Sequence, residues 1–447
     1  MLKRKIDDYI INYYKSSRNA LLITGARQTG KTYSIRQFGK SFKSFIEINF
    51  IETPEAVELF RGTKSSSDIL LRLSTLTSTP LIKGETLVFF DEVQQCPDIV
   101  TAIKFLVDEG SYRYILSGSL LGVELKDLRS EPVGYMGVKN MYPLDFEEFI
   151  TGVGINGKII KSLHEAWIDR RPVDEFVHGK LMELFRLYLV VGGMPAAVNK
   201  YIESNNLQEE MTVQQDIIRL YKRDITHYDP NNKLYIEEIF NLIPPELNAK
   251  NKRFILKRLN EHAKFERIEN SFLWLTNAGV ALPVYNIEEP KTPLLLARSR
   301  NLFKLFQNDI GLLACQYAEG IQLRIIKGDK DINFGSVYEN AVAQELVAHD
   351  IIPYYYNNKK RGELDFVIEW NGKILPIEIK SGKYYETHRA LSNIMDCKEY
   401  DLPEAIVFNN ENLRVTGKIV YAPVYMVMFL EKNNAAPAYY KIDLSGL

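Results

Sequence analysis

Short apolar runs separated by segments of helical character make up the first 120 residues. Three runs, at 20–24, 86–92 and 112–119, are largely apolar, and residues 44–50 alternate between apolar and polar positions. Apolar runs of this length are typical of buried strands, and their alternation with helices is typical of a parallel sheet covered by helices. We therefore predict an α/β unit with a parallel sheet at the start of the chain.

The pattern changes in the next part of the chain. Residues 145–227 show several helical periods, of which 175–191 is the clearest, and a glycine-rich turn at 192–195 interrupts them. Residues 232–285 read as short helices that lead into a strand-like tail at 265–287. We expect mainly helices between the first sheet and that tail.

From about residue 330 the chain again alternates between helix and strand. Residues 336–350 have a helical period, and strand-like runs follow at 354–358, 363–370 and 373–380. This order is typical of a second, smaller α/β unit. The fold class that we predict for the whole chain is therefore α/β.

The length of the chain, 447 residues, is too great for one hydrophobic core, since domains contain roughly 100–200 residues. A boundary is indicated by Pro283, Pro290 and Pro293. Apolar residues make up 46% of the chain and charged residues 25%, so a substantial core can be buried. The net charge is −1, and any basic surface for nucleic acid must therefore be local.

The cysteines and the apolar runs indicate a compartment. Cys96, Cys315 and Cys397 are scattered and form no CxxC pair, which argues against a disulfide framework or a zinc site. The basic N-terminal segment has no apolar core, because Asp7 and Asp8 interrupt it. No uncharged apolar stretch reaches the roughly 18 residues of a membrane span. We expect a cytoplasmic protein without a membrane partner.

The most specific motif is GARQTGKT at residues 25–32, which is GxxxxGK[ST] without a departure. It follows an apolar strand and precedes a helix-compatible segment, as a phosphate-binding loop requires. Its glycines let successive backbone N–H groups converge on one anion, and the helix adds its N-terminal dipole. We expect Lys31 to contact the β- and γ-phosphates of ATP, and Thr32 to offer its hydroxyl to Mg²⁺.

Two adjacent acids end the apolar run at 86–92. We expect Asp91 to bind Mg²⁺, directly or through water, and Glu92 to orient or deprotonate the attacking water. Alone, such a pair is often a solvated strand end, but beside a complete phosphate loop it favours an ATPase over a metabolite kinase. The residues expected to hold the nucleotide are Gly25, Arg27, Gln28, Thr29, Gly30, Lys31, Thr32, Asp91 and Ser117.

The third apolar run ends in Ser117 and Ser119. A polar group there can contact the γ-phosphate or the attacking water, and it can equally be a helix-capping serine, so both readings stay open. No arginine is assigned to the transition state. The candidates Arg113, Arg129 and Arg223 are each better read as solvated side chains.

A basic segment lies at 248–267. It contains seven basic and two acidic residues, and part of it has an apolar face. A basic helix followed by a strand pair is typical of a winged helix that meets DNA phosphates and the major groove. The alternative is a solvated helix face, which is the usual meaning of a charge run.

A second acidic cluster lies near the C-terminus. Residues i and i+2 of a strand share a face, so Glu378 and Lys380 point the same way, as do Glu363 and Asp365. We expect Asp365, Glu378 and the helical Glu339 to hold Mg²⁺, and Lys380 to stabilise or deprotonate a water that attacks a phosphodiester. The alternative is a surface strand with alternating charges. Apolar neighbours favour a buried site, because unpartnered buried charges are costly.

The chain resembles the prokaryotic AAA-like P-loop ATPases that carry a C-terminal DUF4143 domain. The segments that carry the resemblance are GARQTGKT, LVFFDEVQ, LSGSLLG, YPLDFEEFI, YLVVGGMPAAV, YKRDI, FKLFQNDIGLL, SVYENAVAQEL and ELDFVIEWNGKILPIEIKSGK. The last segment is similar to PD-(D/E)xK nuclease folds. One departure concerns residues 134–138, which read GYMGV where the family usually has a Gly-Arg pair. Arginine-mediated sensing from this position is therefore not expected.

The resemblance implies four parts: an ATPase core at 1–150, a helical lid at 151–230, a winged-helix-like part at 231–290 and a nuclease-like domain at 291–447. It implies ATP and Mg²⁺ as ligands and a homo-oligomer as one arrangement. DNA is the partner expected from the basic segment 248–267 and from the nuclease-like C-terminal domain. Two functions compete. In one, ATP hydrolysis controls a nuclease-like domain on DNA; in the other, the chain is a nucleotide-dependent switch or scaffold whose C-terminal fold only binds a protein partner.

Overall fold

The computed structural model describes residues 2–62, 65–119, 134–228, 233–249, 252–255, 265–329, 332, 334–382 and 384–432. The chain forms two compact units, and each is built from separated stretches of sequence. Unit 1 comprises Met1–Ile160, Glu183–Pro283 and Lys304–Gln344, and unit 2 comprises Lys161–Met182, Val284–Phe303 and Glu345–Leu447. The division of the chain into four consecutive parts stays a prediction.

Unit 1 contains a parallel five-stranded sheet with the strand order β2-β3-β4-β1-β5. Its strands are β1 (Ala20–Thr24), β2 (Ser44–Asn49), β3 (Thr86–Asp91), β4 (Arg113–Gly118) and β5 (Met136–Asn140). All six residues of β3 are buried, as the continuous apolar run predicts. The predicted parallel α/β fold is confirmed.

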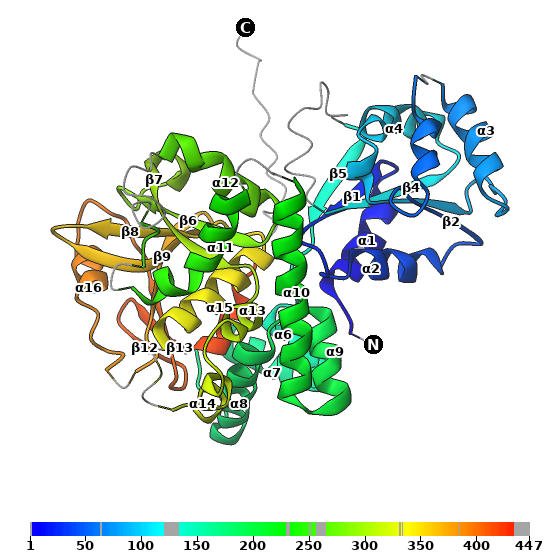
Figure 1. The fold of residues 1–447 in the computed structure, drawn as a ribbon. Helices are drawn as coiled ribbons and strands as arrows, with labels where there is room; N and C mark the ends of the chain where they lie inside the picture. The colour runs from blue at the N-terminus through cyan, green and yellow to red at the C-terminus, as the bar shows by residue number, and fades with distance from the viewer. Residues whose placement is uncertain are drawn as a thin grey trace, which may run out of the picture. The chain divides into compact units, whose positions relative to one another are not determined.

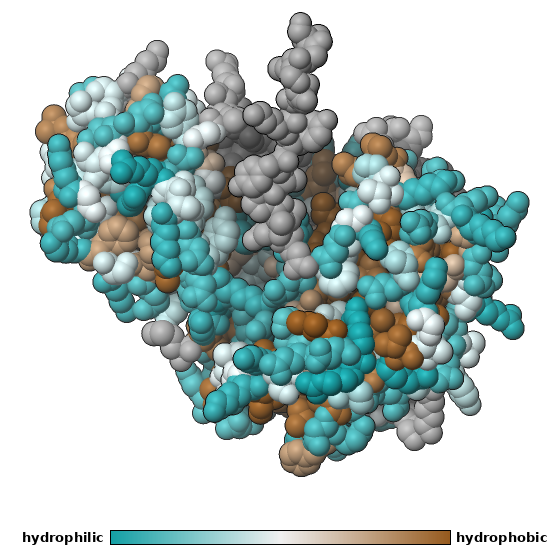
Figure 2. All heavy atoms as spheres, turned by 180° about the vertical axis from the view of Figure 1, so that it is seen from behind, coloured by the Kyte–Doolittle hydropathy of each residue, from teal (hydrophilic) through white to brown (hydrophobic). Residues whose placement is uncertain are grey.

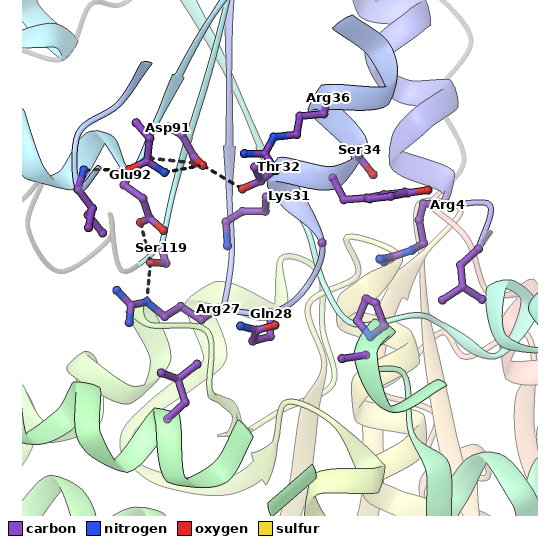
Figure 3. A pocket seen from close by; sticks show the side chains of 18 of the residues that line it. Arg4, Arg27, Gln28, Lys31, Thr32, Ser34, Arg36, Asp91, Glu92 and Ser119 are labelled. Carbon is purple, nitrogen blue, oxygen red and sulfur yellow. Dashed lines mark hydrogen bonds between the residues drawn. The ribbon is translucent and has the colours of Figure 1, made fainter. Parts of the chain in front are cut away.

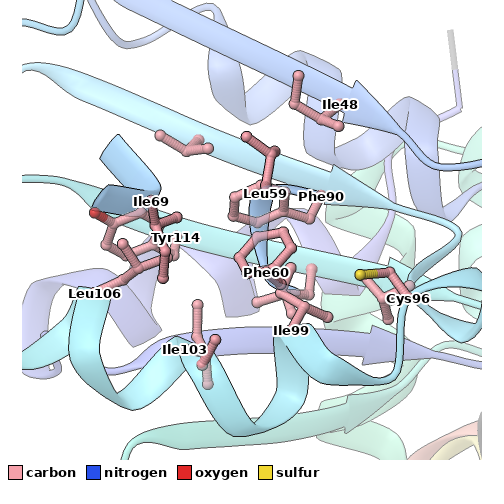
Figure 4. Packing of buried hydrophobic residues seen from close by; sticks show 14 of the residues in the cluster. Ile48, Leu59, Phe60, Ile69, Phe90, Cys96, Ile99, Ile103, Leu106 and Tyr114 are labelled. Carbon is pink, nitrogen blue, oxygen red and sulfur yellow. The ribbon is translucent and has the colours of Figure 1, made fainter. Parts of the chain in front are cut away.

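Helices cover both faces of this sheet (Figure 1). The two pairs are α1 (Lys5–Ser16) with α2 (Lys31–Gly39), and α3 (Ser66–Leu76) with α4 (Asp98–Glu109). Alternate residues of one strand serve opposite faces, so Phe89 packs with α1 and α2, whereas Phe90 packs with α3 and α4. Figure 4 shows the second core, where the ring of Phe60 lies edge-on against Phe90 and where Ile103 and Tyr114 belong to the same cluster. Burying one phenylalanine in this way contributes about 2 kcal/mol.

The parallel register brings polar strand ends together. Asn49 is the partner of Asp91, and Ile23 is the partner of Ser117, which lies in the strand beside β3. The carboxyl ends of parallel strands form one edge of a sheet, and ligands of such sheets bind outside that edge. The loop that follows β1 lies at the same edge.

Helices and short 3₁₀ turns make up most of the remaining parts of unit 1. Helices wholly within this unit are α6 (Phe146–Gly152), α9 (Pro195–Ser204), α10 (Leu207–Tyr228), α11 (Lys233–Asn248), α12 (Phe265–Asn277), α13 (Ile310–Cys315) and α14 (Ile321–Lys327). Three helices run from one unit into the other: α7 (Gly157–Ile168), α8 (Glu175–Val191) and α15 (Phe334–Ala348). The 3₁₀ turns are η1 (Pro54–Leu59) and η2 (Val93–Gln95).

The strand-like interpretation of 265–277 is wrong, because this stretch is helix α12. Its aromatic and β-branched residues suggest a strand, yet Phe272, Leu275 and Ala278 are buried at three-residue spacing, which is the period of a helix face. The tail becomes a strand only at β6 (Ala281–Ile287), which pairs with β8 (Tyr354–Asn358) far along the chain. In the described part of 231–290 the strand pair expected of a winged helix is therefore not formed.

A mixed sheet with the order β12-β13-β11-β10-β9-β8-β6-β7 forms most of unit 2. The strands not yet named are β7 (Arg298–Gln307), β9 (Gly362–Trp370), β10 (Lys373–Ile379), β11 (Ala405–Asn409), β12 (Arg414–Thr416) and β13 (Ile419–Pro423). Helix α16 (Arg389–Met395) packs on the sheet, and Leu391 and Ile394 lie in the core with Val367 and Val407. The short turns η5 (Leu294–Ala297) and η6 (Val424–Phe429) complete the unit.

The surface is mainly hydrophilic on the face that Figure 2 shows, with apolar residues in small patches. Exposed apolar side chains such as Leu296 and Tyr384 are ordinary for a protein surface. Within the described ranges no single helix is both long and apolar enough to cross a membrane, although α8 and α9, bent by 120°, pass that test of length and composition as a pair.

Candidate active site

The loop between β1 and α2 adopts the backbone conformation of a phosphate cradle. Gly25 and Gly30 have φ angles of 136° and 97°, and Gln28 between them has a φ of 66°. A Cβ on Gly25 would lie 2.2 Å from the carbonyl oxygen of Met141, so only glycine fits this position. Gly30 is the N-cap residue of α2, so the free backbone N–H groups of the first turn of this helix point toward the loop.

Lys31 is folded over this loop. Its Nζ donates to the carbonyl oxygens of Gly25, at 2.9 Å, and Ala26, at 2.8 Å. Burial lowers the pKa of Lys31 to about 8, and the negative charges of Glu92 and Asp91 partly oppose that change. The ammonium is thus held where phosphate oxygens can replace the two carbonyls as its partners.

Asp91, at the end of β3, accepts hydrogen bonds from several elements. Oδ2 accepts from Thr32 Oγ1 at 3.0 Å and from Asn49 Nδ2 at 3.3 Å. Oδ1 accepts from the Ser117 hydroxyl and from the backbone N–H of Glu92, at 3.0 Å for the latter. A hydroxyl and a carboxylate side by side are oxygen ligands of the kind that Mg²⁺ prefers, so this pair fits the predicted metal. No motif in the sequence places Asn49 in the site, since it ends β2, a different strand that belongs to no motif.

Glu92 lies beside Asp91 but in a different environment (Figure 3). Its φ of 55° places it in the left-handed region, which non-glycine residues rarely adopt and which is concentrated at functional sites. Oε2 accepts from Ser119 Oγ at 3.3 Å and from Gln94 Nε2. The two serines therefore have different partners: Ser117 contacts Asp91, and Ser119 contacts Glu92.

Arg27 extends from the phosphate loop to helix α10. Its Nε donates to Ser119 Oγ at 3.3 Å, and Nη1 pairs with Asp224 Oδ1 at 2.8 Å. Tyr221, one turn before Asp224, donates its hydroxyl to the carbonyl oxygen of Arg27 at 3.2 Å. Asp224 and Tyr221 belong to the segment YKRDI that resembles the family, but the sequence did not indicate a contact with Arg27, about two hundred positions away.

Arg4 supports the loop from the other side. Its Nη1 donates to the carbonyl oxygen of Thr29 at 2.9 Å, Nη2 donates to that of Tyr142 at 2.8 Å, and Nε pairs with Glu148 at 3.0 Å. Burial raises the pKa of Glu148, the Asp145 charge adds to this, and Arg4 opposes it. This buried pair connects the phosphate loop with the YPLDFEEFI segment.

These residues line a cavity of about 760 Å³, which is within the size range of small-molecule sites. Gly30, Lys31, Thr32, Asp91, Glu92 and Ser119 line one region, and the other lining residues include Leu2, Tyr33, Pro195, Ala196 and Asn199. Of the other predicted nucleotide-binding residues, Arg27 and Gln28 also line the cavity, whereas Gly25 and Thr29 belong to the same loop without lining it. Ser117 lies on β4, where its hydroxyl contacts Asp91, and does not line the cavity. The structure therefore brings the predicted loop, metal-binding and base residues to one place.

The C-terminal acids have partners of other kinds. Asp365 Oδ2 accepts from the backbone N–H of Ile379 at 2.8 Å, and Lys380 Nζ pairs with Glu378 at 2.7 Å. Glu339, in unit 1, pairs with Lys252 and lies 3.6 Å from the buried ammonium of Lys304. Across the residues that the structure describes, no group of three or more His, Cys, Asp or Glu side chains can hold a metal. The nuclease-like site stays a prediction.

The remaining sequence candidates are placed as follows. Arg113 donates to the carbonyl oxygen of Ser17 at 3.5 Å, and Arg223 is exposed on α10, beside a separate cavity of about 450 Å³. Arg129 lies outside the described residues. The predicted DNA-binding segment is described only in part, since residues 250–251 and 256–264 are outside the description. Its Lys252 is engaged with Glu339.

Three family profiles match the chain. An "AAA domain" profile matches residues 17–150, a "Domain of unknown function (DUF8612)" profile matches 182–322, and a "Domain of unknown function (DUF4143)" profile matches 334–426. A comparison with curated protein sequences found no match. The first profile covers the five-stranded sheet and the phosphate loop, and the third covers strands β8 to β13.

Several solved structures are similar to part of the chain. A Walker-type ATPase of Pyrococcus abyssi has 14% identity over 71% of this chain and 96% of its own, with a TM-score of 0.41. The Orc1 protein of Aeropyrum pernix, solved in complex with DNA, has 11% identity over 73% and 91%, with a TM-score of 0.25. Cdc6p of Pyrobaculum aerophilum has 13% identity over 73% and 95%, with a TM-score of 0.24.

The sequence motif, the parallel sheet and the family profiles agree on the same N-terminal stretch, and the DUF4143 profile covers most of the C-terminal part. The chain therefore joins an AAA domain of the P-loop ATPase type to a DUF4143 domain.

Proposed function

We propose that the chain binds Mg²⁺-ATP in the cavity at the phosphate loop and hydrolyses it. The observation that carries the proposal is the hydrogen bond of 3.0 Å between Thr32 and Asp91, with Glu92 adjacent at the same sheet edge. A protein that only holds a nucleotide needs the loop and its lysine. Hydrolysis also requires a base that accepts a proton from the attacking water, and the carboxylate of Glu92 beside the loop can be that base.

Each residue then has a distinct part in the reaction. The backbone N–H groups of the loop and Lys31 bind the phosphates, and Glu92 accepts a proton from water as the water oxygen attacks the γ-phosphorus. The new O–P bond forms as the bond from the γ-phosphorus to the bridging oxygen breaks, and ADP leaves with that electron pair. Mg²⁺, held by Thr32 and Asp91, would neutralise charge on the β- and γ-phosphate oxygens.

Calorimetric titration with Mg²⁺-ATP tests the binding part. Lys31→Ala removes a charged group that holds phosphate, and losing about 2 kcal/mol in this way corresponds to at least about a 30-fold loss of affinity. Lys40→Ala is the matched control, because Lys40 is exposed at the end of α2 and contacts Gln37. Equal affinities for the wild type and Lys31→Ala would remove the phosphate loop from the proposal.

A second proposal concerns what the nucleotide cycle serves. The cycle can control a nuclease-like domain associated with DNA, or it can switch a catalytically inactive nuclease-like fold that binds a protein partner. The environment of Glu339 favours the inactive fold. Two ammonium groups, those of Lys252 and Lys304, already lie against this carboxylate, which would have to leave them in order to bind a metal. Contact with DNA through 248–267 stays a prediction.

A further inference from the structure

The guanidinium of Arg27 lies at the phosphate region of the cavity, although it belongs to the loop itself. It donates to Ser119 Oγ at 3.3 Å, and Ser119 in turn donates to Glu92 Oε2 at 3.3 Å. Figure 3 shows this chain of contacts running from Glu92 through Ser119 to Arg27. A single side chain, that of Ser119, therefore links the Arg27 guanidinium to the Glu92 carboxylate, which we assign to the attacking water.

Helix α10 fixes Arg27 at two points. Asp224 pairs with the guanidinium at 2.8 Å, and the Tyr221 hydroxyl donates to the Arg27 carbonyl oxygen at 3.2 Å. Residues three apart on a helix lie on one face, so a single face of α10 contacts both the side chain and the backbone of Arg27. Tyr221 is itself buried and accepts from Asn308 Nδ2 at 3.5 Å.

The burial of the ion pair shows that this placement is enforced. The Asp224 side chain is 10% exposed and that of Arg27 is 22% exposed. A loop arginine with only a solvation role would extend into water, where a long charged side chain keeps its rotamer freedom. Here the buried carboxylate of Asp224 holds the guanidinium against the cavity that Lys31, Thr32 and Glu92 also line.

We infer that Arg27 is a built-in arginine that stabilises the charge on the transferred phosphoryl group, and that Asp224 of α10 is its positioning residue. The inference rests on the proposed hydrolysis of ATP. As the water oxygen bonds to the γ-phosphorus and the bond to the bridging oxygen breaks, negative charge grows on the oxygens around the γ-phosphorus and on the leaving ADP. Arg27 donates hydrogen bonds to these oxygens and keeps its own proton, since guanidinium does not deprotonate in proteins.

Two consequences follow from an arginine supplied by the same chain. Hydrolysis does not require an arginine from a neighbouring copy, so the specific activity is independent of protein concentration. A movement of α10 changes the rate through Asp224, which gives the helical part of unit 1 a direct effect on the chemistry.

The test measures turnover and two affinities in Arg27→Ala, Arg27→Lys and Asp224→Asn. Arg27→Ala is expected to change Mg²⁺-ATP affinity by less than about 10-fold and to lower kcat by about 100- to 1,000-fold, the effect of losing one transition-state donor. Its affinity for ADP with aluminium fluoride, which mimics the transferred phosphoryl group, falls by a similar factor, whereas its ADP affinity stays. Asp224→Asn lowers kcat by about 10-fold with ATP affinity retained, as expected of a partner that only orients the donor.

The controls separate this role from folding. Arg219→Ala removes an exposed arginine from the same helix, where it pairs with Asp216, and is expected to leave all three quantities unchanged. Arg27→Lys keeps the positive charge and loses the planar fork, so a folded Arg27→Lys with low kcat carries the test if Arg27→Ala does not fold.

Specific results overturn the inference. Wild-type kcat in a folded Arg27→Ala or Arg27→Lys would do so, and so would equal losses of ATP affinity and kcat, which indicate ground-state binding only. These results leave the proposed hydrolysis intact. A wild-type protein that neither hydrolyses ATP nor binds ADP with aluminium fluoride more tightly than ADP would overturn both the hydrolysis and the role of Arg27.

Discussion

Two neighbouring acids in this site, Asp91 and Glu92, differ in their surroundings in a way that separates their roles. Asp91 is buried and accepts from Thr32, Asn49 and Ser117, so its carboxylate is held in place for the metal-binding role that we propose. Glu92 turns away through a left-handed backbone and contacts two neutral donors. Neutral donors hold a carboxylate without neutralising it, which is what a base that receives a proton requires.

Glu210 gives a pH prediction at the residue scale. Burial raises its pKa from 4.5 to about 9, and the charge of Asp309 adds to this. The folded protein therefore keeps a proton that the unfolded chain releases above pH 4.5. Stability is lost as the pH rises from about 5 toward 9, by at most about 1.4 kcal/mol per pH unit.

Glu210→Gln carries no titrating proton at this position. Its urea unfolding midpoint should therefore fall less than that of the wild type as the pH rises from about 5 to 9. Urea unfolding at several pH values measures the difference. Parallel pH profiles of the two proteins would show that Glu210 is not protonated in the folded state.

The turn at 192–195 shows how an element depends on single backbone positions. The Gly193 N–H donates to Asp309 Oδ2 at 2.6 Å, and its carbonyl oxygen accepts from the Leu144 N–H at 2.7 Å. A Cβ on Gly193 would lie 2.1 Å from the carbonyl oxygen of Leu144. The turn therefore connects α8 and α9 with the N-cap residue of α13 and with the YPLDFEEFI segment through the backbone groups of Gly193.

Gly193→Ala is expected to lower the free energy of unfolding by about 3 kcal/mol, because the new methyl group meets the backbone. Gly179→Ala is the matched control: Gly179 lies exposed in α8 with open space around its Cβ position. Alanine there should raise stability by about 0.5–1 kcal/mol, as in an exposed helix. Urea unfolding of both variants measures the difference, and equal stabilities would refute the close approach at Gly193.

Sequence patterns predicted the elements whose information is local. GARQTGKT and the acids after β3 are contiguous motifs, and their strands are continuous apolar runs. Asn49 and Arg4 join the site only because the fold brings distant residues together, so no pattern pointed to them. Asp224 lies in the segment YKRDI that resembles the family, but its contact with Arg27 could not be predicted from that segment. The strand-like residues at 265–277 form a helix because packing of one face outweighs their β propensity.

At the scale of the whole molecule, the DUF4143 domain joins residues of both compact units. Its profile begins at 334, within α15, and residues 334–344 of this helix belong to unit 1, whereas the strands β8 to β13 belong to unit 2. Glu339, on the unit 1 part of α15, contacts lysines of its own unit. The acids of the predicted nuclease site thus each have a partner of their own: lysines for Glu339, the Ile379 N–H for Asp365 and Lys380 for Glu378.

We predict that the protein does not cleave DNA. Single-stranded, double-stranded and branched DNA incubated with Mg²⁺ or Mn²⁺ should stay intact, and Asp365→Ala and Lys380→Ala should behave as the wild type does. Glu339→Gln should instead lower stability by up to about 3–5 kcal/mol, because it removes the carboxylate charge that lies 3.6 Å from the buried ammonium of Lys304. Wild-type cleavage that Asp365→Ala abolishes would restore the nuclease function.

The central claim is that one chain binds Mg²⁺-ATP and uses Glu92 to hydrolyse it. A single-turnover assay with protein in excess over γ-labelled ATP measures this, with calorimetry reporting affinity for the same variants. Glu92→Gln should bind ATP within about 3-fold of the wild type and release phosphate about 100- to 10,000-fold more slowly, the range for losing a general base. The control Glu55→Gln, at an exposed glutamate of η1, should match the wild type. Phosphate release by Glu92→Gln at the wild-type rate would contradict the account.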